Sequence, residues 1–149
     1  MCTIYLWGRK MDNIIIKEGL IPEIDQLMDL YSDVEWLIYT KDKIKLYNAV
    51  NNSLKVITAW DDEKLVGLIR VVGDGHTIIY IQDILVLKNY QGKGIGSSLL
   101  KLVLEQYKSI RQVVLMTDDT DKTINFYEKN GMRKTSHYNC LTFVKFNPI

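Results

Sequence analysis

Apolar residues recur along the first half of the chain with two different periods, and each period predicts a kind of element. Residues 14–17 form a short β-branched run and predict a strand. Apolar positions at helical spacing predict one helix over residues 22–31, opened by Pro22, and a second over residues 41–50. Two extended runs, at 54–60 and 64–72, flank a short acidic stretch and predict a β-hairpin.

The second half of the chain alternates strands and helices. Residues 77–87 are apolar almost throughout, which is typical of a strand buried on both faces in the centre of a sheet. Residues 94–108 repeat as an amphipathic helix, 112–116 as a strand, and 123–130 as a short helix that Gly131 ends. Residues 142–145 predict a closing strand.

This order of elements predicts an α/β fold, of the α+β kind, in which a mixed and mostly antiparallel central sheet carries helices on both faces. Only the strand–helix–strand unit over residues 77–116 has to be a parallel, right-handed crossover. The chain of 149 residues, 47% of them hydrophobic, suits one domain over residues 1–149 with a substantial core. Residues 1–12 are expected to form an extra strand or a flexible tail.

Charge and cysteine content exclude several classes of function. A formal net charge of +1, with basic residues scattered along the chain, gives no support for nucleic-acid binding. Cys2 and Cys140 lie far apart, and His76 and His137 are isolated, so reduced thiols and no metal site are expected. No apolar run approaches the roughly 20 residues of a membrane span, and no signal peptide is recognised, so a cytoplasmic protein without a membrane partner is expected.

A glycine-rich loop stands where the central strand leads into the amphipathic helix. Gly92, Gly94 and Gly96 let backbone N–H groups curl towards a ligand, and the helix that follows adds the positive end of its dipole. This pattern is typical of a pyrophosphate site. A P-loop is disfavoured because Lys93 is followed by glycine rather than Ser or Thr, and a Rossmann fingerprint lacks its third glycine at Leu99. The alternative interpretation is a helix start that the glycines merely ease.

Two motifs together carry a family resemblance. Gln-x-x-Gly-x-Gly begins at Gln91, and a block from Asn125 to Met132 resembles the signature Phe-Tyr-x-x-x-Gly-Phe, with Met132 in place of the last Phe. Both resemble the GNAT superfamily of N-acetyltransferases, and the resemblance runs from about residue 14 to residue 144. The sequence of residues 80–87 is similar to that of small bacterial and plant members of the arylalkylamine type, which acetylate amines such as serotonin.

The resemblance implies acetyl-CoA as the cofactor and CoA as a product. It assigns the pyrophosphate to the loop residues Gln91, Gly92, Lys93, Gly94, Ile95, Gly96 and Ser97. It also implies that the strands on either side of the long helix splay apart, so that backbone groups of Ile84, Leu85 and Val86 pair with pantetheine. Thr120 falls where many members have an Asn that contacts pantetheine, and its hydroxyl either does the same or caps the next helix.

Asp83 is the candidate general base, because an acceptor amine must lose a proton before it attacks a thioester. The carboxylate interrupts an apolar run, where it would be costly without a partner. The alternative is a structural Asp that pairs with Arg70 or Lys64 across the sheet. Many members carry their acid or His three residues earlier, at the position of Tyr80, so Tyr80 or a chain of waters is the other candidate base.

Tyr127 is the candidate general acid, since the resemblance implies that this phenol protonates the departing CoA thiolate; the alternative is a core aromatic. The first two helices and their loop are expected to form a wall of the acceptor site. There Glu35 would meet an ammonium group and Trp36 would offer an aromatic face, with Tyr80 also contacting the substrate. Ordinary helix packing is the alternative for this wall.

The function predicted from the sequence is an acetyl-CoA-dependent N-acetyltransferase that moves an acetyl group to a small or aromatic primary amine by direct attack within a ternary complex. Neither motif contains a cysteine, so an acyl-cysteine intermediate has no support. The alternatives are a non-catalytic acyl-CoA sensor and a protein-lysine or N-terminal acetyltransferase. The predicted partner is the amine, and a homodimer stays open because dimers are common among such proteins.

Overall fold

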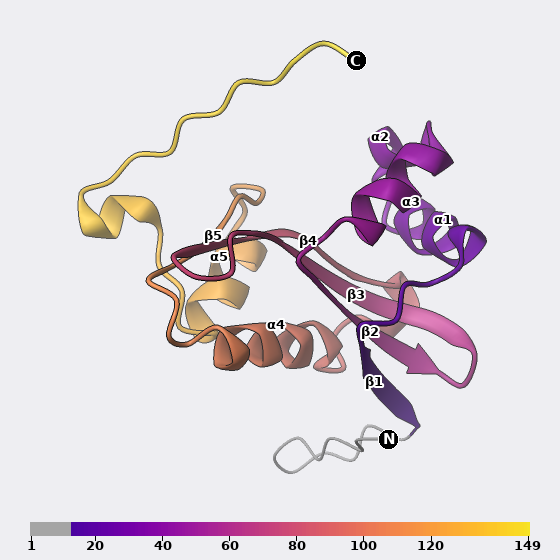
Figure 1. The fold of residues 1–149 in the computed structure, drawn as a ribbon. Coiled ribbons are helices and arrows are strands. Elements are labelled where there is room, and N and C mark those ends of the chain that lie inside the picture. The colour runs from indigo at the N-terminus through magenta and orange to yellow at the C-terminus, as the bar shows by residue number, and fades with distance from the viewer. Residues whose placement is uncertain (1–12) are drawn as a thin grey trace. The chain divides into compact units, whose positions relative to one another are not determined.

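The computed structural model describes residues 13–149 and shows two compact units, which meet in the sequence between Met116 and Thr117. Each unit is described by itself. The first contains the sheet and the helices that cover it, and the second contains one α-helix and the C-terminal segment (Figure 1). The expectation of an extra strand or a flexible tail at residues 1–12 lies outside the described residues.

The first unit follows the predicted order of elements. Its strands are β1 (Ile14–Glu18), β2 (Lys55–Asp61), β3 (Lys64–Gly73), β4 (Ile78–Val86) and β5 (Gln112–Leu115). Its helices are α1 (Ile24–Asp33), α2 (Leu37–Thr40), α3 (Lys43–Asn51), the 3-10 turn η1 (Lys88–Tyr90) and α4 (Ile95–Gln106). The sequence did not predict α2 and η1, because each is about one turn long and carries too few residues to show a period.

The five strands form one sheet in the order β1-β2-β3-β4-β5. Neighbouring strands are antiparallel except for β4 and β5, which run parallel and are joined through α4. A parallel pair needs such a long connection, because the chain must return to the same end of the sheet. The prediction of a mixed, mostly antiparallel sheet with one parallel strand–helix–strand unit is confirmed.

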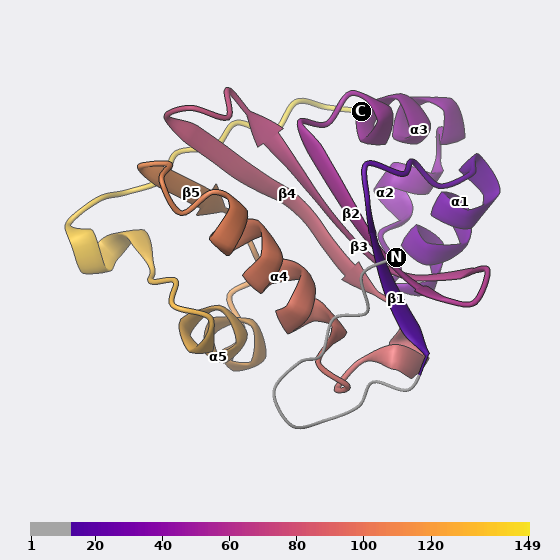
Figure 2. The same ribbon diagram turned by 60° about the horizontal axis from the view of Figure 1, so that its bottom comes forward.

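Helices cover both faces of this sheet, with α4 on one face and α1 to α3 on the other (Figure 2). Gly67 of β3 lies beneath α4, where a Cβ atom would meet Ile95 Cγ2 at 3.1 Å. Arg70, three residues further along β3, lies on the opposite face and reaches Ser53 Oγ, just after α3, at 3.4 Å. The glycine therefore lets α4 approach the sheet closely, and the prediction of helices on both faces is confirmed.

The hydrophobic core of the first unit is built from the sheet and from both helix layers. Its helical part consists of Leu27, Leu30, Tyr31, Leu46, Val50, Leu99, Leu100 and Val103. Two charged side chains, Arg70 and Asp83, are buried with this core, and they lead to the candidate site below. None of the helices within residues 13–149 is both long enough and apolar enough to cross a lipid bilayer.

The second unit consists of α5 (Asp121–Lys129), the 3-10 turn η2 (Thr135–Tyr138) and an irregular C-terminal segment. Helix α5 begins at a cap, in which the Thr120 hydroxyl accepts a hydrogen bond from the backbone N–H of Thr123 at 3.3 Å. It ends in a Schellman motif, in which Gly131 has a φ of 86° and the Met132 N–H donates to the Tyr127 carbonyl at 3.1 Å. The predicted stop at Gly131 is confirmed.

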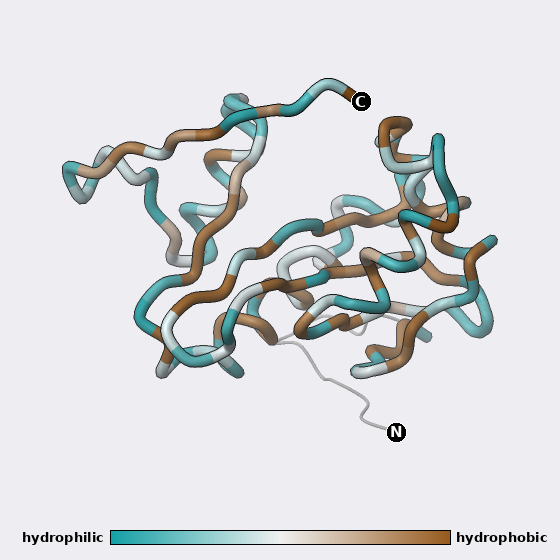
Figure 3. The backbone as a smooth tube through the Cα atoms, turned by 45° about the horizontal axis from the view of Figure 1, so that its top comes forward, coloured by the Kyte–Doolittle hydropathy of each residue, from teal (hydrophilic) through white to brown (hydrophobic). Residues whose placement is uncertain are grey.

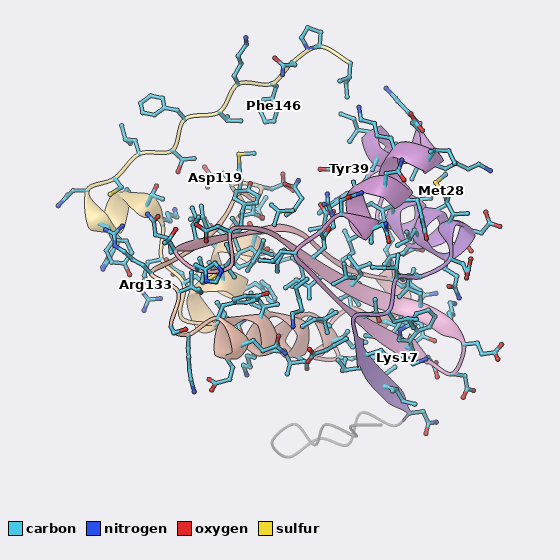
Figure 4. All side chains as sticks on the ribbon, viewed as in Figure 1. Lys17, Met28, Tyr39, Asp119, Arg133 and Phe146 are labelled. Carbon is cyan, nitrogen blue, oxygen red and sulfur yellow. The ribbon has the colours of Figure 1, made fainter. Side chains whose placement is uncertain are left out.

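The predicted closing strand at residues 142–145 is wrong. These residues take no regular secondary structure, and their apolar side chains are exposed, with Phe143 reaching 90%. Figure 3 shows the alternation of hydrophobic and hydrophilic residues in this segment, and Figure 4 labels Phe146 within it. A strand needs a neighbour that shares its backbone hydrogen bonds, and the sheet formed by the described residues does not include this segment.

Candidate active site

Strand β5 is shorter than β4, so part of β4 has no partner on that side among residues 13–149. Pairing joins Ile78–Ile81 of β4 to Gln112–Leu115 of β5, whereas β4 continues to Val86. The backbone of residues 82–86 therefore has an edge that β5 does not occupy. Ile84, Leu85 and Val86, the expected pantetheine-binding residues, all lie in this unpaired part of β4, and the splay that the family resemblance implied stays a prediction.

A β-bulge in β4 places the candidate base. Arg70 of β3 lies opposite Asp83, but the next residue, Val71, lies opposite Ile81, so Gln82 is an extra residue in β4. Tyr80 lies opposite Val72, which is on the same face of β3 as Arg70. Since directly opposed residues share a face, the bulge brings Tyr80 and Asp83 to the face of the sheet that α1 to α3 cover.

The glycine-rich loop has the backbone expected of an anion site. Gly92 and Gly94 have φ values of 74° and 88°, and a Cβ atom on either would meet nothing within 4 Å. Gly94 is the N-cap of α4, so the N–H groups of Ile95, Gly96 and Ser97 have no partner within the helix. Open space above these donors and the helix dipole both suit a pyrophosphate, and the residues present fit CoA.

Side chains around the loop add positive charge to it. Lys93 Nζ lies 5.2 Å from the centre of the Tyr90 ring, and Lys64 Nζ lies 5.7 Å from the same ring. The Tyr90 hydroxyl donates to Asp61 at 2.6 Å, which fixes the ring between the β2–β3 hairpin and the loop. Gln91 Nε2 donates to the Val86 carbonyl at 2.9 Å, so this side chain ties the loop to the end of β4.

Asp83 is buried, as expected, and its side chain is 0% exposed. Its Oδ2 accepts hydrogen bonds from the Tyr31 hydroxyl at 2.6 Å and from Arg70 Nε, while Oδ1 is buried without a hydrogen-bond partner. Of the two cross-sheet partners considered from the sequence, Arg70 rather than Lys64 pairs with this carboxylate. The pairing agrees with the structural alternative, whereas the role of Asp83 as a base stays a prediction.

The groups around Asp83 keep fixed protonation states. Burial, followed by the charge of Asp83 and its hydrogen bond, raises the pKa of Tyr31 far above its usual value, so this phenol remains a donor. Burial alone would lower the pKa of the Arg70 guanidinium, but the charge and hydrogen bond of Asp83, together with Tyr31, raise it overall. Burial, with smaller contributions from Tyr39 and Asp83, raises the pKa of Tyr80.

Three aromatic residues lie next to Asp83, and we call them the aromatic cluster: Tyr31 of α1, Trp36 at the N-cap of α2, and Tyr39 of α2. The ring centre of Tyr31 lies 6.2 Å from the ring centre of Trp36 and 5.7 Å from that of Tyr39, and both contacts are edge-on. The Tyr39 hydroxyl accepts a hydrogen bond from Gln82 Nε2 at 3.3 Å, which connects the cluster to the bulge. Figure 4 labels Tyr39.

Glu35 does not join the aromatic cluster. Its side chain is 76% exposed and forms an ion pair with Lys88 at 3.1 Å. The structure thus brings together Trp36, Tyr80 and Asp83 among the predicted site residues. Tyr31 and Tyr39 belong to the segment expected to form the acceptor wall, Arg70 was one of the two partners considered for Asp83, and Gln82 is the residue that the sequence did not indicate. A pocket of about 400 Å³ between α1, the β2–β3 hairpin and residues 87–90 contains none of the predicted site residues.

Tyr127 and Thr120 belong to the second unit. Burial raises the pKa of Tyr127, opposed by a hydrogen bond with Thr117, so the phenol is protonated at neutral pH. Its ring packs edge-on against Phe126, with centres 5.0 Å apart. Thr120 has the capping role that was one of its two expected roles, and a contact with pantetheine stays a prediction. Within residues 13–149, no group of three His, Cys, Asp or Glu side chains is arranged to hold a metal ion.

The sequence pattern of the Acetyltransferase (GNAT) family matches residues 21–132. Because the match covers most of the chain, the chain belongs to the GNAT family of acetyltransferases. Acetyl transfer is the activity of this family, and its fold generally uses acetyl-CoA.

Individual relatives agree with this assignment. A GNAT family acetyltransferase from Streptococcus pneumoniae TIGR4 has a similar structure, with a TM-score of 0.80 and 38% identity over 90% of this chain and 98% of that one. The uncharacterized N-acetyltransferase ycf52 of Gracilaria tenuistipitata var. liui is 25% identical over 85% of this chain and 71% of its own length. A ycf52-like N-acetyltransferase of Prochlorococcus marinus is 30% identical over 73% of this chain and 62% of its own length. These names state no acceptor, so the likeness to arylalkylamine members stays a prediction.

Proposed function

We propose that this chain transfers the acetyl group of acetyl-CoA to a small primary amine that carries an aromatic or other apolar part. The observation that carries the proposal is the aromatic cluster beside the buried Asp83. Aromatic rings favour the apolar part of such an amine by burial and its ammonium group by cation–π attraction. We also propose that both units form one catalytic domain, since the family match at residues 21–132 crosses the boundary between them.

The glycine-rich loop and the open edge of β4 hold the cofactor in this proposal. Backbone N–H groups from Gly92 to Ser97 bind the pyrophosphate, and Lys93 adds a neutralising charge. Backbone groups of residues 84–86 pair with the pantetheine amides. Acetyl-CoA supplies the activated acetyl thioester when it is bound.

Asp83 and Tyr127 move the protons. The Asp83 carboxylate takes one proton from the acceptor ammonium, and the amine nitrogen then bonds to the acetyl carbon as the carbon–sulfur bond breaks. Tyr127 Oη gives its proton to the departing sulfur and regains one from the acylated nitrogen, so the amine loses two protons in all. The protein's main contribution is to hold the amine and the thioester together, and no covalent enzyme intermediate forms.

The first test is turnover by the unaltered protein. Release of free thiol from acetyl-CoA is measured with arylalkylamines, polyamines and a lysine peptide, together with calorimetric titration of CoA. Turnover with arylalkylamines supports the proposal, and turnover with the peptide alone would replace the acceptor by protein lysine. Tight CoA binding without turnover of any amine would make the chain an acyl-CoA sensor.

The second test concerns Asp83. The substitution Asp83→Asn removes the base but keeps a side chain of similar size, so the rate should fall most at low pH, where the acceptor is protonated. At high pH the amine is already deprotonated, so the rates of the variant and of the unaltered protein should become similar. An equal rate for Asp83→Asn and the unaltered protein at every pH would leave Asp83 a structural residue.

A further inference from the structure

One oxygen of the buried Asp83 carboxylate is left without a hydrogen-bond partner. The Oδ2 atom has two donors, the Tyr31 hydroxyl at 2.6 Å and Arg70 Nε, whereas Oδ1 has none. Among residues 13–149, Oδ1 is the one buried side-chain nitrogen or oxygen atom in this state. An unsatisfied buried acceptor is costly, so a donor from a ligand would stabilise this atom.

Tyr31 joins this carboxylate to the aromatic cluster. Its ring is fully buried and makes edge-on contacts with Trp36 and Tyr39, while its hydroxyl donates to Asp83. A single side chain from α1 thus contributes to the apolar wall and also determines which oxygen of the carboxylate is occupied. A phenylalanine at position 31 would keep the ring in the apolar wall but would lack the hydroxyl that donates to Asp83.

We propose that Tyr31 and Arg70 are positioning residues that saturate Asp83 Oδ2, so that Oδ1 accepts an N–H of an arylalkylamine acceptor whose aromatic part lies against Trp36 and Tyr39. This inference rests on the proposed function. The two donors come from different elements, α1 and β3, and together they oppose rotation of the carboxylate. The acceptor nitrogen is then held at the group that takes its proton.

Three other charged or titratable groups face Asp83, and none of them changes its protonation state near neutral pH. Arg70 faces the carboxylate from β3, Tyr31 from α1 and Tyr80 from β4. The pKa of each is raised, so the guanidinium stays charged and both phenols stay neutral. From the end of α3, the hydroxyl of Ser53 contacts Arg70 and does not titrate.

The test compares Tyr31→Phe with Tyr39→Phe. Both remove one hydroxyl from the aromatic cluster and keep its rings, but the Tyr31 hydroxyl is bonded to Asp83 and the Tyr39 hydroxyl to Gln82. We measure kcat and KM for an arylalkylamine across pH, CoA affinity by calorimetry and thermal stability. Tyr31→Phe should lower kcat/KM about tenfold or more, as expected for a lost hydrogen bond to a charged group. The loss should be largest at low pH, where the acceptor is protonated and depends on Asp83 to remove its proton.

Tyr39→Phe should keep the pH profile of the unaltered protein, and both variants should keep its CoA affinity. A Tyr31→Phe variant with the pH profile and kcat/KM of Tyr39→Phe would overturn the inference. An unaltered protein that acetylates no arylalkylamine would instead refute the proposed function, and this outcome is seen before any variant is made.

A second measurement needs no variant, in case Tyr31→Phe does not fold. Inhibition of the unaltered enzyme is compared for a dead-end arylalkyl tertiary ammonium, which keeps one N–H, and the quaternary ammonium of the same skeleton, which keeps the charge and has no N–H. If Oδ1 accepts an N–H, the tertiary compound should bind about tenfold tighter. Equal binding would show that charge and aromatic contact suffice, and would overturn the inference.

Discussion

Arg70 and Asp83 lie directly opposite each other on β3 and β4, and their side chains form an ion pair inside the first unit. Both are almost completely shielded from water, with 7% and 0% of their side-chain surfaces exposed. Each charge is therefore compensated chiefly by the other, and by the Tyr31 hydroxyl on the carboxylate side. Removal of one partner leaves the other charged in an apolar environment, which is far more costly than the loss of an exposed pair.

Arg70→Met should lower the free energy of unfolding by about 3–5 kcal/mol, because it leaves the Asp83 carboxylate buried and uncompensated. Urea denaturation measures the change. Lys108→Met is the matched control, since it removes an exposed ion pair with Glu105 and should have no measurable effect. Equal stability of the two variants would mean that the buried pair is not important for folding.

Gly94→Val should abolish CoA binding in a calorimetric titration. Gly94 has a φ of 88°, which a β-branched residue strongly disfavours, and the new side chain would fill the open space above the donors of α4. Gly19→Val is the control, because Gly19 has a φ of 71°, also has open space around its Cα, and precedes α1 rather than α4. The control should lose similar stability and still bind CoA; if Gly94→Val binds CoA as tightly, the cofactor does not use this loop.

Tyr127→Phe should lower kcat on the order of 10²-fold while CoA affinity stays nearly unchanged, because only the proton donor is lost. Since burial raises the pKa of Tyr127, the loss of this proton should not limit the unaltered enzyme until the pH exceeds about 10. Tyr138→Phe, at an exposed tyrosine of the same unit, should leave both quantities alone. An unchanged kcat in Tyr127→Phe would remove this phenol from the mechanism.

Asp74 should make the stability of the first unit depend on pH in the acid range. The hydroxyl of Thr77 and the N–H groups of Thr77, His76 and Ile78 hold the pKa of Asp74 far below its usual value. A lowered pKa in the folded state stabilises the protein above the unfolded value of about 4, and the contribution is lost as the pH falls further. Asp74→Asn should therefore reduce stability most near pH 7 and least near pH 2, as measured by urea denaturation. If the stability difference between Asp74→Asn and the unaltered protein does not depend on pH, the charge of Asp74 does not stabilise the fold.

Most of the first unit could be predicted because its elements are set by local periods. Helix α4 and the hairpin of β2 and β3 each repeat their apolar residues over two or more periods, so their existence follows from the sequence alone. Residues 142–145 also contain β-branched and aromatic residues, but pairing depends on a neighbour that no local pattern specifies. The splay of β4 from β5 comes only from the family resemblance and stays a prediction.

The candidate site was harder to predict because its contacts join distant parts of the chain. Tyr31 and Asp83 are 52 residues apart, and the sequence placed Tyr31 at the end of a helix in the expected acceptor wall without indicating its contact with Asp83. The Tyr31 hydroxyl could have indicated this contact, because a buried tyrosine hydroxyl needs a hydrogen-bond partner and so does a buried carboxylate such as Asp83. The bulge at Gln82 left no recognisable mark, because an extra residue in an apolar run changes neither composition nor length appreciably.

The extra residue Gln82 changes which side chains of β4 lie on the same face of the sheet. In an uninterrupted strand, side chains three residues apart point to opposite faces, but across Gln82 the side chains of Tyr80 and Asp83 share one face. An acid at position 80 would therefore lie on the same face of the sheet as Asp83. Deletion of Gln82, in contrast, would turn residues 78–81 over relative to Asp83 and separate the two positions.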